Sequence, residues 1–124
     1  MNDLIFHITT RAAWERARAS GRYAPDSLEL EGFIHCCAVE QVVGAGEAHF
    51  AGMRDLLLLW IAASRLRAPL RYERSEDGEV FPHVYGALNL DAVVGVAPFV
   101  EGDGGFVLPR EVRRLATRRP GTTS

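Results

Sequence analysis

Three of the four histidines in this chain lie among apolar or aromatic neighbours and are the residues best suited to chemistry. His7 lies in residues 4–10, His35 in residues 31–37 and His83 in residues 81–86. A neutral imidazole offers one hydrogen-bond donor and one acceptor, so it can hold a hydroxyl group or move a proton near neutral pH. Because a hydrophobic core has no packing need for three imidazoles, the pattern predicts a shared polar pocket.

Each histidine alone also fits a structural role, as a ring whose nitrogens are satisfied by hydrogen bonds. The matching contexts of His7 and His35 favour a site, because each lies near the end of a predicted strand that leads into a helix. Loops and helix N-termini converge at such strand ends. Thr9 and Thr10 follow His7 and could either line the pocket or cap the next helix.

Glu73 and Tyr85 are the further candidates. Glu73 could act as a general base or bind a ribose hydroxyl, or it could be a solvated strand residue paired with Arg71. His83 and Tyr85 lie in residues 81–86, where a proline and a glycine restrict the backbone, and we interpret this segment as a rigid loop. That loop could direct both side chains into the pocket, or its aromatic rings could pack at the edge of the core.

Zinc binding and thiol chemistry are two further hypotheses. Three histidines could bind zinc, but their spacings match no compact ligand motif, and we expect no metal. Cys36 shares a predicted strand face with Ile34 and is expected in the core, whereas Cys37 stays open as a nucleophile. Adjacent cysteines rarely form a disulfide, and free thiols fit a cytoplasmic location.

The apolar pattern predicts two helices in the first half of the chain and a mostly antiparallel sheet, an order typical of the α+β class. In chain order the predicted elements are a strand over residues 4–8, a helix over 11–20, a strand over 33–36, a helix over 39–50, and strands over 56–63, 70–74, 93–100 and 106–108. The strand over 56–63 is apolar on both faces and should be central, with the strand over 70–74 beside it. Gly44 and Gly46 either weaken their helix or allow close packing, and Pro98 places its strand at an edge or bulge.

Length and charge limit the domain organisation and the partners. The 124 residues fit one domain, which we place at residues 1–110, followed by a short basic tail at 111–124 that we expect to be frayed. No apolar run approaches the ~20 residues of a membrane span, so we expect no membrane partner. Five arginines and one acid follow residue 109, which leaves the body with a net negative charge and argues against a nucleic-acid partner.

Two strings of residues make the chain resemble a known bacterial family. They are Glu-Gly-Phe-Ile-His at residues 31–35 and Phe-Pro-His-Val-Tyr-Gly at residues 81–86. Together with Trp14 and neighbouring positions over residues 3–110, they resemble domain-of-unknown-function family 952.

The first third of the chain is also similar in layout to RNA 2′-phosphotransferases of the ADP-ribosyltransferase superfamily. The similarity rests on the order of a few residues, namely His7, Ile8, Thr9, Trp14, Gly21, Ile34 and His35. It implies a split, mostly antiparallel sheet around an NAD-shaped groove, in which His7 and Thr9 contact the nicotinamide-side ribose or amide. His35 would line the same groove, and a third catalytic position would fall on Glu73 or His83.

The chain also departs from that superfamily. Ile8 replaces the glycine of its His-Gly-Thr strand, and no arginine matches its phosphate-binding arginines. The resemblance therefore supports a prediction of the fold more strongly than a prediction of the reaction.

We predict an ADP-ribosyltransferase-like enzyme, a transferase of the ADP-ribosyl or glycosyl type, or a protein that binds an NAD-derived nucleotide, with NAD as a substrate. The predicted catalytic residues are His7, His35, Glu73 and His83. The predicted nucleotide contacts are His7, Thr9, Thr10, His35 and Tyr85. Two alternatives are a histidine-based acid–base enzyme that acts on a small metabolite without NAD, and a non-catalytic ligand-binding module of the same fold.

Overall fold

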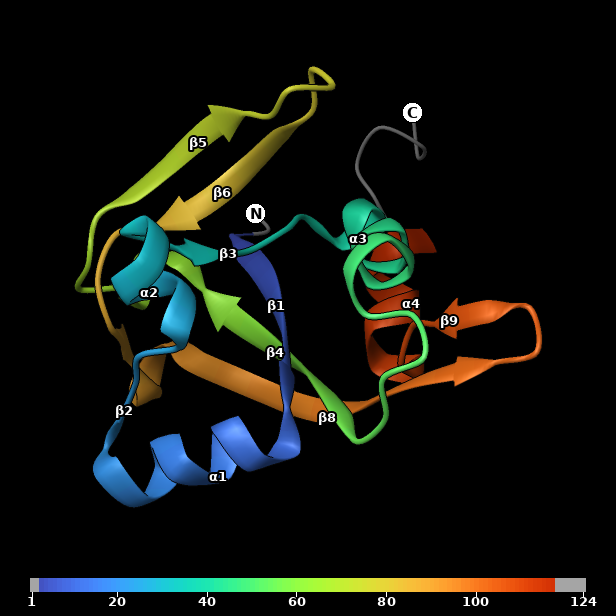
Figure 1. The fold of residues 1–124 in the computed structure, drawn as a ribbon, viewed down its shortest axis with the longest axis horizontal. Helices are drawn as coiled ribbons and strands as arrows, with labels where there is room; N and C mark the ends of the chain where they lie inside the picture. The colour runs from blue at the N-terminus through green and yellow to red at the C-terminus, as the bar shows by residue number, and fades with distance from the viewer. Residues whose placement is uncertain (1–2, 118–124) are drawn as a thin grey trace.

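The computed structural model describes residues 3–117, which form a mixed fold of helices and antiparallel strands (Figure 1). In chain order the elements are β1 (Leu4–Thr10), α1 (Arg11–Ser20), β2 (Arg22–Tyr23), α2 (Asp26–Glu31), β3 (Ile34–His35), η1 (Val39–Gln41), α3 (Val42–His49), β4 (Leu56–Ala62), η2 (Ala63–Arg65), β5 (Leu70–Arg74), β6 (Val80–Val84), β7 (Leu88–Asn89), η3 (Leu90–Ala92), β8 (Val93–Gly102), β9 (Gly105–Val107) and α4 (Arg110–Thr117). Within this range the strands form antiparallel sheets in the orders β1-β4-β8-β9, β3-β6-β5 and β2-β7. The mixture of helices with antiparallel strands confirms the predicted α+β class.

Strand β4 lies between β1 and β8, as its apolar sequence predicted. Alternate residues of a strand point to opposite faces, so a strand that is apolar throughout must be covered on both. Leu57, Leu59 and Ile61 belong to one buried cluster, and Leu56 and Leu58 belong to a second cluster on the other side. Full burial of one such side chain is worth about 1.5–3 kcal/mol. These five side chains therefore tie both halves of the core to a single strand.

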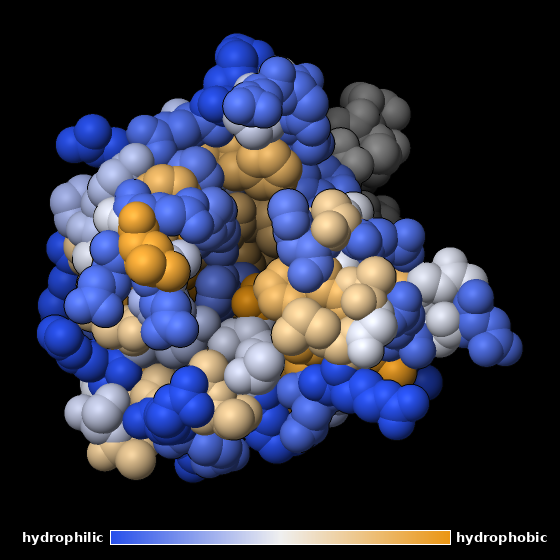
Figure 2. Space-filling model, viewed as in Figure 1, coloured by the Kyte–Doolittle hydropathy of each residue, from blue (hydrophilic) through white to orange (hydrophobic). Residues whose placement is uncertain are grey.

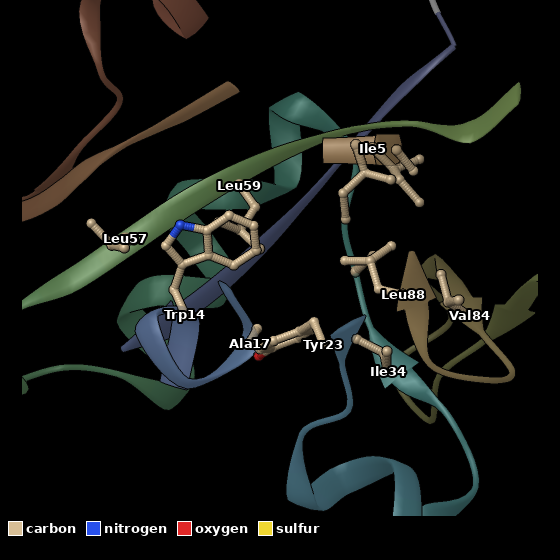
Figure 3. Packing of buried hydrophobic residues seen from close by; sticks show 12 residues of the cluster. Ile5, Trp14, Ala17, Tyr23, Ile34, Leu57, Leu59, Val84 and Leu88 are labelled. Atoms are coloured by element: carbon tan, nitrogen blue, oxygen red, sulfur yellow. The ribbon is translucent and has the colours of Figure 1, made fainter. Parts of the chain in front are cut away.

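Helix α1 covers the face of β4 that carries the first cluster. It begins after Thr10, whose hydroxyl oxygen accepts a hydrogen bond of 3.1 Å from the backbone N–H of Ala13. It ends at Gly21, which has a φ of 91° that glycine adopts without strain. Trp14 and Ala17 lie on its buried face and pack into the first cluster (Figure 3). The predicted bounds and cap of this helix are confirmed.

Helix α3 packs closely on the second cluster at Gly46. A Cβ atom there would lie 2.9 Å from the ring of Phe99 and 3.0 Å from the ring of Phe106, two rings that stack on each other. Gly44 has no neighbouring atom within 4 Å of the same position. The close-packing interpretation is therefore right for Gly46 and wrong for Gly44.

Two predictions about the later strands are wrong. Strand β5 does not lie beside β4 but pairs with β6 in the three-stranded β3-β6-β5 sheet, which we call the small sheet. The segment 81–86, predicted as a loop, contains most of β6, which lies between β3 and β5. The carbonyl of Pro82 accepts a hydrogen bond of 3.1 Å from the backbone N–H of Cys36. Pro82 has no N–H with which to donate a hydrogen bond back to β3, so the pairing of β6 with β3 ends after two residue pairs.

Two further segments differ from the prediction. Residues 22–30, which lie between the predicted helix over 11–20 and the predicted strand over 33–36, contain most of α2, and this helix ends at Gly32 in a left-handed conformation. Residues 111–117, expected in a frayed tail, belong to α4, because the side chain of Val112 is buried in the second cluster. The rest of the predicted tail, 118–124, lies outside the described residues.

The prediction for Pro98 is confirmed. Strand β8 pairs with β4 over residues 93–99 and with β9 only over residues 100–102. Pro98 therefore lies where the strand has a partner on one side only.

The segment 34–37 joins the small sheet to the large sheet, which is the four-stranded β1-β4-β8-β9 sheet. Cys37 and Phe6 exchange two backbone hydrogen bonds of 2.8 Å, while Cys36 bonds to β6. In Figure 1 the β5–β6 hairpin lies on one side of β1 and β4, and α3, α4 and β9 lie on the other. Figure 2 shows a hollow between these two sides, over β3 and β1, with apolar side chains along part of it. No helix within residues 3–117 is long and apolar enough to cross a membrane.

Candidate functional site

A cluster of polar and aromatic side chains lies on one face of the β3-β6-β5 sheet. In register, His35 is opposite His83, and His83 is opposite Arg71. The adjacent pair, Ile34 and Val84, is fully buried in the first cluster. Because side chains alternate along a strand, the odd-numbered residues of these strands share the face away from that core.

Glu73 holds two other residues of this face. One oxygen of its carboxylate, Oε1, accepts a hydrogen bond of 2.7 Å from Nδ1 of His83 and one of 2.6 Å from the hydroxyl of Tyr85. These hydrogen bonds, first from Tyr85 and then from His83, lower the pKa of Glu73. The bond to Glu73 also raises the pKa of the Tyr85 hydroxyl. An ionised carboxylate only accepts, so Nδ1 of His83 carries a proton and Nε2 of the neutral ring has a free lone pair.

His35 lies beside His83, with the two ring centroids 5.5 Å apart. Phe33 contacts both rings: its centroid is 4.0 Å from that of His83, in a stacked arrangement, and 4.7 Å from that of His35. Nε2 of His35 donates a hydrogen bond of 2.8 Å to the carboxylate of Glu31, at the end of α2. The face therefore carries two histidine–glutamate pairs: His35–Glu31 is exposed, and His83–Glu73 is half-buried.

His7 lies behind this face and does not share it. Its Nδ1 donates a hydrogen bond of 2.6 Å to the backbone carbonyl of His35, so Nε2 of the neutral ring accepts from the hydroxyl of Tyr23 at 2.7 Å. The residue is 8% exposed, and burial lowers the pKa of the ring from 6.5 to about 4. The structure thus brings His35 and His83 together and gives His7 a buried position that supports β3.

Thr9 and Thr10 also lie away from the exposed face. The hydroxyl of Thr9 is 2.9 Å from that of Tyr23, which extends the buried hydrogen-bonded chain beyond His7. Burial raises the pKa of Tyr23 to about 12, so this hydroxyl keeps its proton. Thr10 caps α1, which is the alternative that its position in the sequence left open.

Both cysteines are buried and free. Burial raises the pKa of the Cys37 thiol to about 12 and also raises that of Cys36. A thiol needs to ionise to act as a nucleophile, so neither suits that role. Cys36 packs in the first cluster with Ile34, as predicted from the shared strand face.

The predicted residues therefore fall into two groups. His35, Glu73, His83 and Tyr85 meet on the outer face of the small sheet, whereas His7, Thr9 and Thr10 serve the interior and a helix cap. Sequence reasoning did not assign a site role to Glu31, Phe33 or Arg71. Alternation along the predicted strand over residues 33–36 puts Phe33 on the same face as His35, and this signal could have identified Phe33 as a site residue.

A surface depression elsewhere in residues 3–117 does not involve the predicted site residues. A depression of about 370 Å³ between α1, β4 and β8 is lined by Arg11, Trp14 and Pro98 among others, and by none of the predicted site residues. Among residues 3–117, no group of three or more His, Cys, Asp or Glu side chains is arranged to hold a metal ion.

Comparison with known proteins identifies relatives but no activity. The model of the family described as a protein of unknown function, DUF952, matches residues 8–96. The crystal structure of protein CC0527 from Caulobacter crescentus is similar, at 35% identity and a TM-score of 0.77 over 91% of this chain and 98% of that one. Its solution NMR structure gives 33% identity and a TM-score of 0.76 over 94% and 100%. No curated protein matches the chain. The similarity to RNA 2′-phosphotransferases stays a prediction.

Proposed function

This chain belongs to the DUF952 family of unknown function, and we propose that it catalyses proton transfer on a small metabolite at the outer face of the β3-β6-β5 sheet. His83 is the general base, Glu73 fixes its tautomer, and His35 is the second group that donates or accepts a proton. This is the acid–base alternative predicted from the sequence, without NAD.

The proposal rests on one observation, which is that a single oxygen of Glu73 accepts hydrogen bonds from both His83 and Tyr85. A carboxylate that binds Nδ1 of an imidazole holds the ring in one orientation and leaves Nε2 as the basic atom. The same oxygen orients the hydroxyl of Tyr85 next to that ring. The ring of His35, whose centroid lies 5.5 Å from that of His83, supplies a second titratable group close enough to contact the same small molecule.

The ADP-ribosyltransferase-like proposal has less support from the geometry. It needs His7 to contact the ribose or amide of NAD, but both ring nitrogens of His7 are engaged inside the protein. The acid–base proposal uses groups of the outer sheet face alone. The split-sheet arrangement of that superfamily rests on the sequence resemblance.

The proposal is tested by hydrogen exchange at carbon. The protein is incubated in D2O with a panel of small hydroxy, keto and amino acids, sugars and sugar phosphates, each with and without NAD, and proton NMR follows the loss of carbon-bound protons and the appearance of products. We expect exchange or turnover without NAD. Glu73→Gln and His83→Asn should each lower the rate by about 10²-fold or more, the usual contribution of general acid–base catalysis.

Glu76→Gln is the matched control, because Glu76 is an exposed acid in the turn between β5 and β6. If the exchange rate of Glu73→Gln equals that of Glu76→Gln, the proposed role of Glu73 is contradicted. Turnover that requires NAD would favour the transferase. Binding that needs His35 or His83 with no exchange or product would favour the non-catalytic binding module.

A further inference from the structure

We propose that Arg71 binds an oxyanion of the substrate, a carboxylate or a phosphate, and therefore that the site takes acidic metabolites. This inference rests on the proposed function and names the substrate class of the same site. Arg71 was considered in the sequence only as an ion-pair partner of Glu73.

The fold places Arg71 beside the proposed base. It lies on β5 directly opposite His83 of β6, and directly opposed side chains of antiparallel strands are close neighbours. Its guanidinium carbon lies 5.1 Å from the centre of the Tyr85 ring. Contact with an aromatic face restricts the guanidinium group without using its hydrogen-bond donors. Arg71 is therefore positioned at the site with its donors available.

The nearby carboxylates do not occupy these donors. Glu73 uses its Oε1 for His83 and Tyr85, and Glu31 bonds to His35. Among residues 3–117, the guanidinium of Arg71 donates no hydrogen bond, and no carboxylate forms a salt bridge with it. An exposed guanidinium with five free N–H donors matches the planar, bidentate geometry of a carboxylate or phosphate.

Arg71 supplies a permanent positive charge on this face, and that charge helps to lower the pKa of Glu73. Glu73 and Glu31 form their hydrogen bonds with histidines and not with Arg71. An oxyanion bound to Arg71 would lie on the same sheet face as His83, the proposed base, because the two residues are directly opposed across β5 and β6. Arg74, on the same strand, alternates to the other face and donates to the carbonyl of Gly78 at 2.8 Å.

The test is a titration of the full chain with inorganic phosphate and, separately, with acetate, at constant ionic strength set by sodium chloride. NMR follows the side-chain N–H of Arg71 and the ring resonances of His83. We expect saturable shifts at both residues. Arg71→Gln should weaken binding by about tenfold or more, because charge-assisted bidentate bonds are lost, whereas Arg74→Gln should retain it. Arg71→Lys, which keeps the charge without the planar fork, should fall between them.

Absence of saturable shifts with both anions in the native protein would overturn the inference. So would equal losses in Arg71→Gln and Arg74→Gln, which would show only unspecific charge effects. His83→Asn separates this inference from the proposed function: it should lower exchange at carbon by about 10²-fold or more and keep phosphate or acetate binding. Exchange that is insensitive to Arg71→Gln, with uncharged substrates turned over equally well, refutes the inference alone. Anion binding at Arg71 with no exchange for any acid refutes the proposed function alone.

Discussion

Glu73 controls the protonation of two neighbouring groups through one oxygen atom. Because the Tyr85 hydroxyl donates to this carboxylate, ionisation of Tyr85 would place two negative charges side by side, and this raises its pKa. We predict that Glu73→Gln lowers the pKa of Tyr85 toward its ordinary value of 10.0. NMR titration of the protein labelled with 13C-tyrosine resolves Tyr85 from Tyr23 and measures the change.

Tyr23 is the internal reference, because its pKa of about 12 arises mainly from burial and should not change. Glu76→Gln supplies the matched variant in the same hairpin. A Tyr85 titration that is the same in Glu73→Gln and Glu76→Gln would mean that the hydrogen bond to Glu73 does not exist in solution.

His7 predicts a pH dependence of stability. Its pKa is about 4 in the folded protein against 6.5 for an unperturbed ring, so between these values the unfolded chain binds more protons. Stability from the neutral ring is therefore fully present above pH 6.5 and is lost as the pH falls toward 4. The loss is on the order of 3 kcal/mol in the free energy of unfolding.

Urea unfolding at a series of pH values measures this loss. His7→Asn keeps a donor for the His35 carbonyl but does not titrate, so its stability should change less over this window. His49→Gln removes an exposed histidine on α3 and should keep the native slope. If His7→Asn and the native protein lost stability in parallel, His7 would not be the buried neutral group described above.

At the scale of elements, Gly46 decides how closely α3 approaches the second cluster. Gly46→Ala would place a methyl group 2.9 Å from Phe99, and overpacking of this kind costs about 1–3 kcal/mol. Gly44→Ala in the same helix meets no atom and should stabilise the protein by about 0.5–1 kcal/mol through helix propensity. Chemical denaturation of the two variants measures both, and changes of the same sign would contradict the packing of α3.

Much of the element structure could be predicted, because local signals decide it. The cap and stop of α1 lie next to the helix, and the continuous apolar run of β4 requires burial on both faces. Strand β6 could not be predicted in the same way. Proline and glycine in residues 81–86 are local signs of a loop, whereas its pairing with β3 and β5 depends on residues far away in the chain.

The same distinction explains the site. Alternation along the strands placed Phe33 and His35 on one face, and the local context of His7 resembled that of His35. Their environments differ because Tyr23, which comes from a separate strand, covers the ring of His7. No periodicity in residues 4–10 shows which distant side chain covers that face. The pairing of Glu73 with His83 likewise depends on the register between β5 and β6.

At the scale of the whole molecule, the segment 34–37 joins the small sheet to the large one. Its mutual bonds with Phe6 place the backbone of His35 next to the ring of His7. We predict that the amide protons of Phe6 and Cys37 exchange with solvent only on global unfolding, like those of β4. Native-state hydrogen exchange measures this, with the hairpin residues Asp103 and Gly104 as rapidly exchanging references. Exchange of Cys37 at a much lower free energy than β4 would show that the sheets open independently.

The proposed function depends on Glu73, which fixes His83 with a proton on Nδ1 and a free, basic Nε2. The most direct test is 15N NMR of the histidine rings at a pH where the ring of His83 is neutral, with His49 as the exposed reference. We expect a protonated Nδ1 and an unprotonated Nε2 for His83, and loss of this preference in Glu73→Gln. A proton on Nε2 of His83 in the native protein, or a tautomer unchanged by Glu73→Gln, would contradict it.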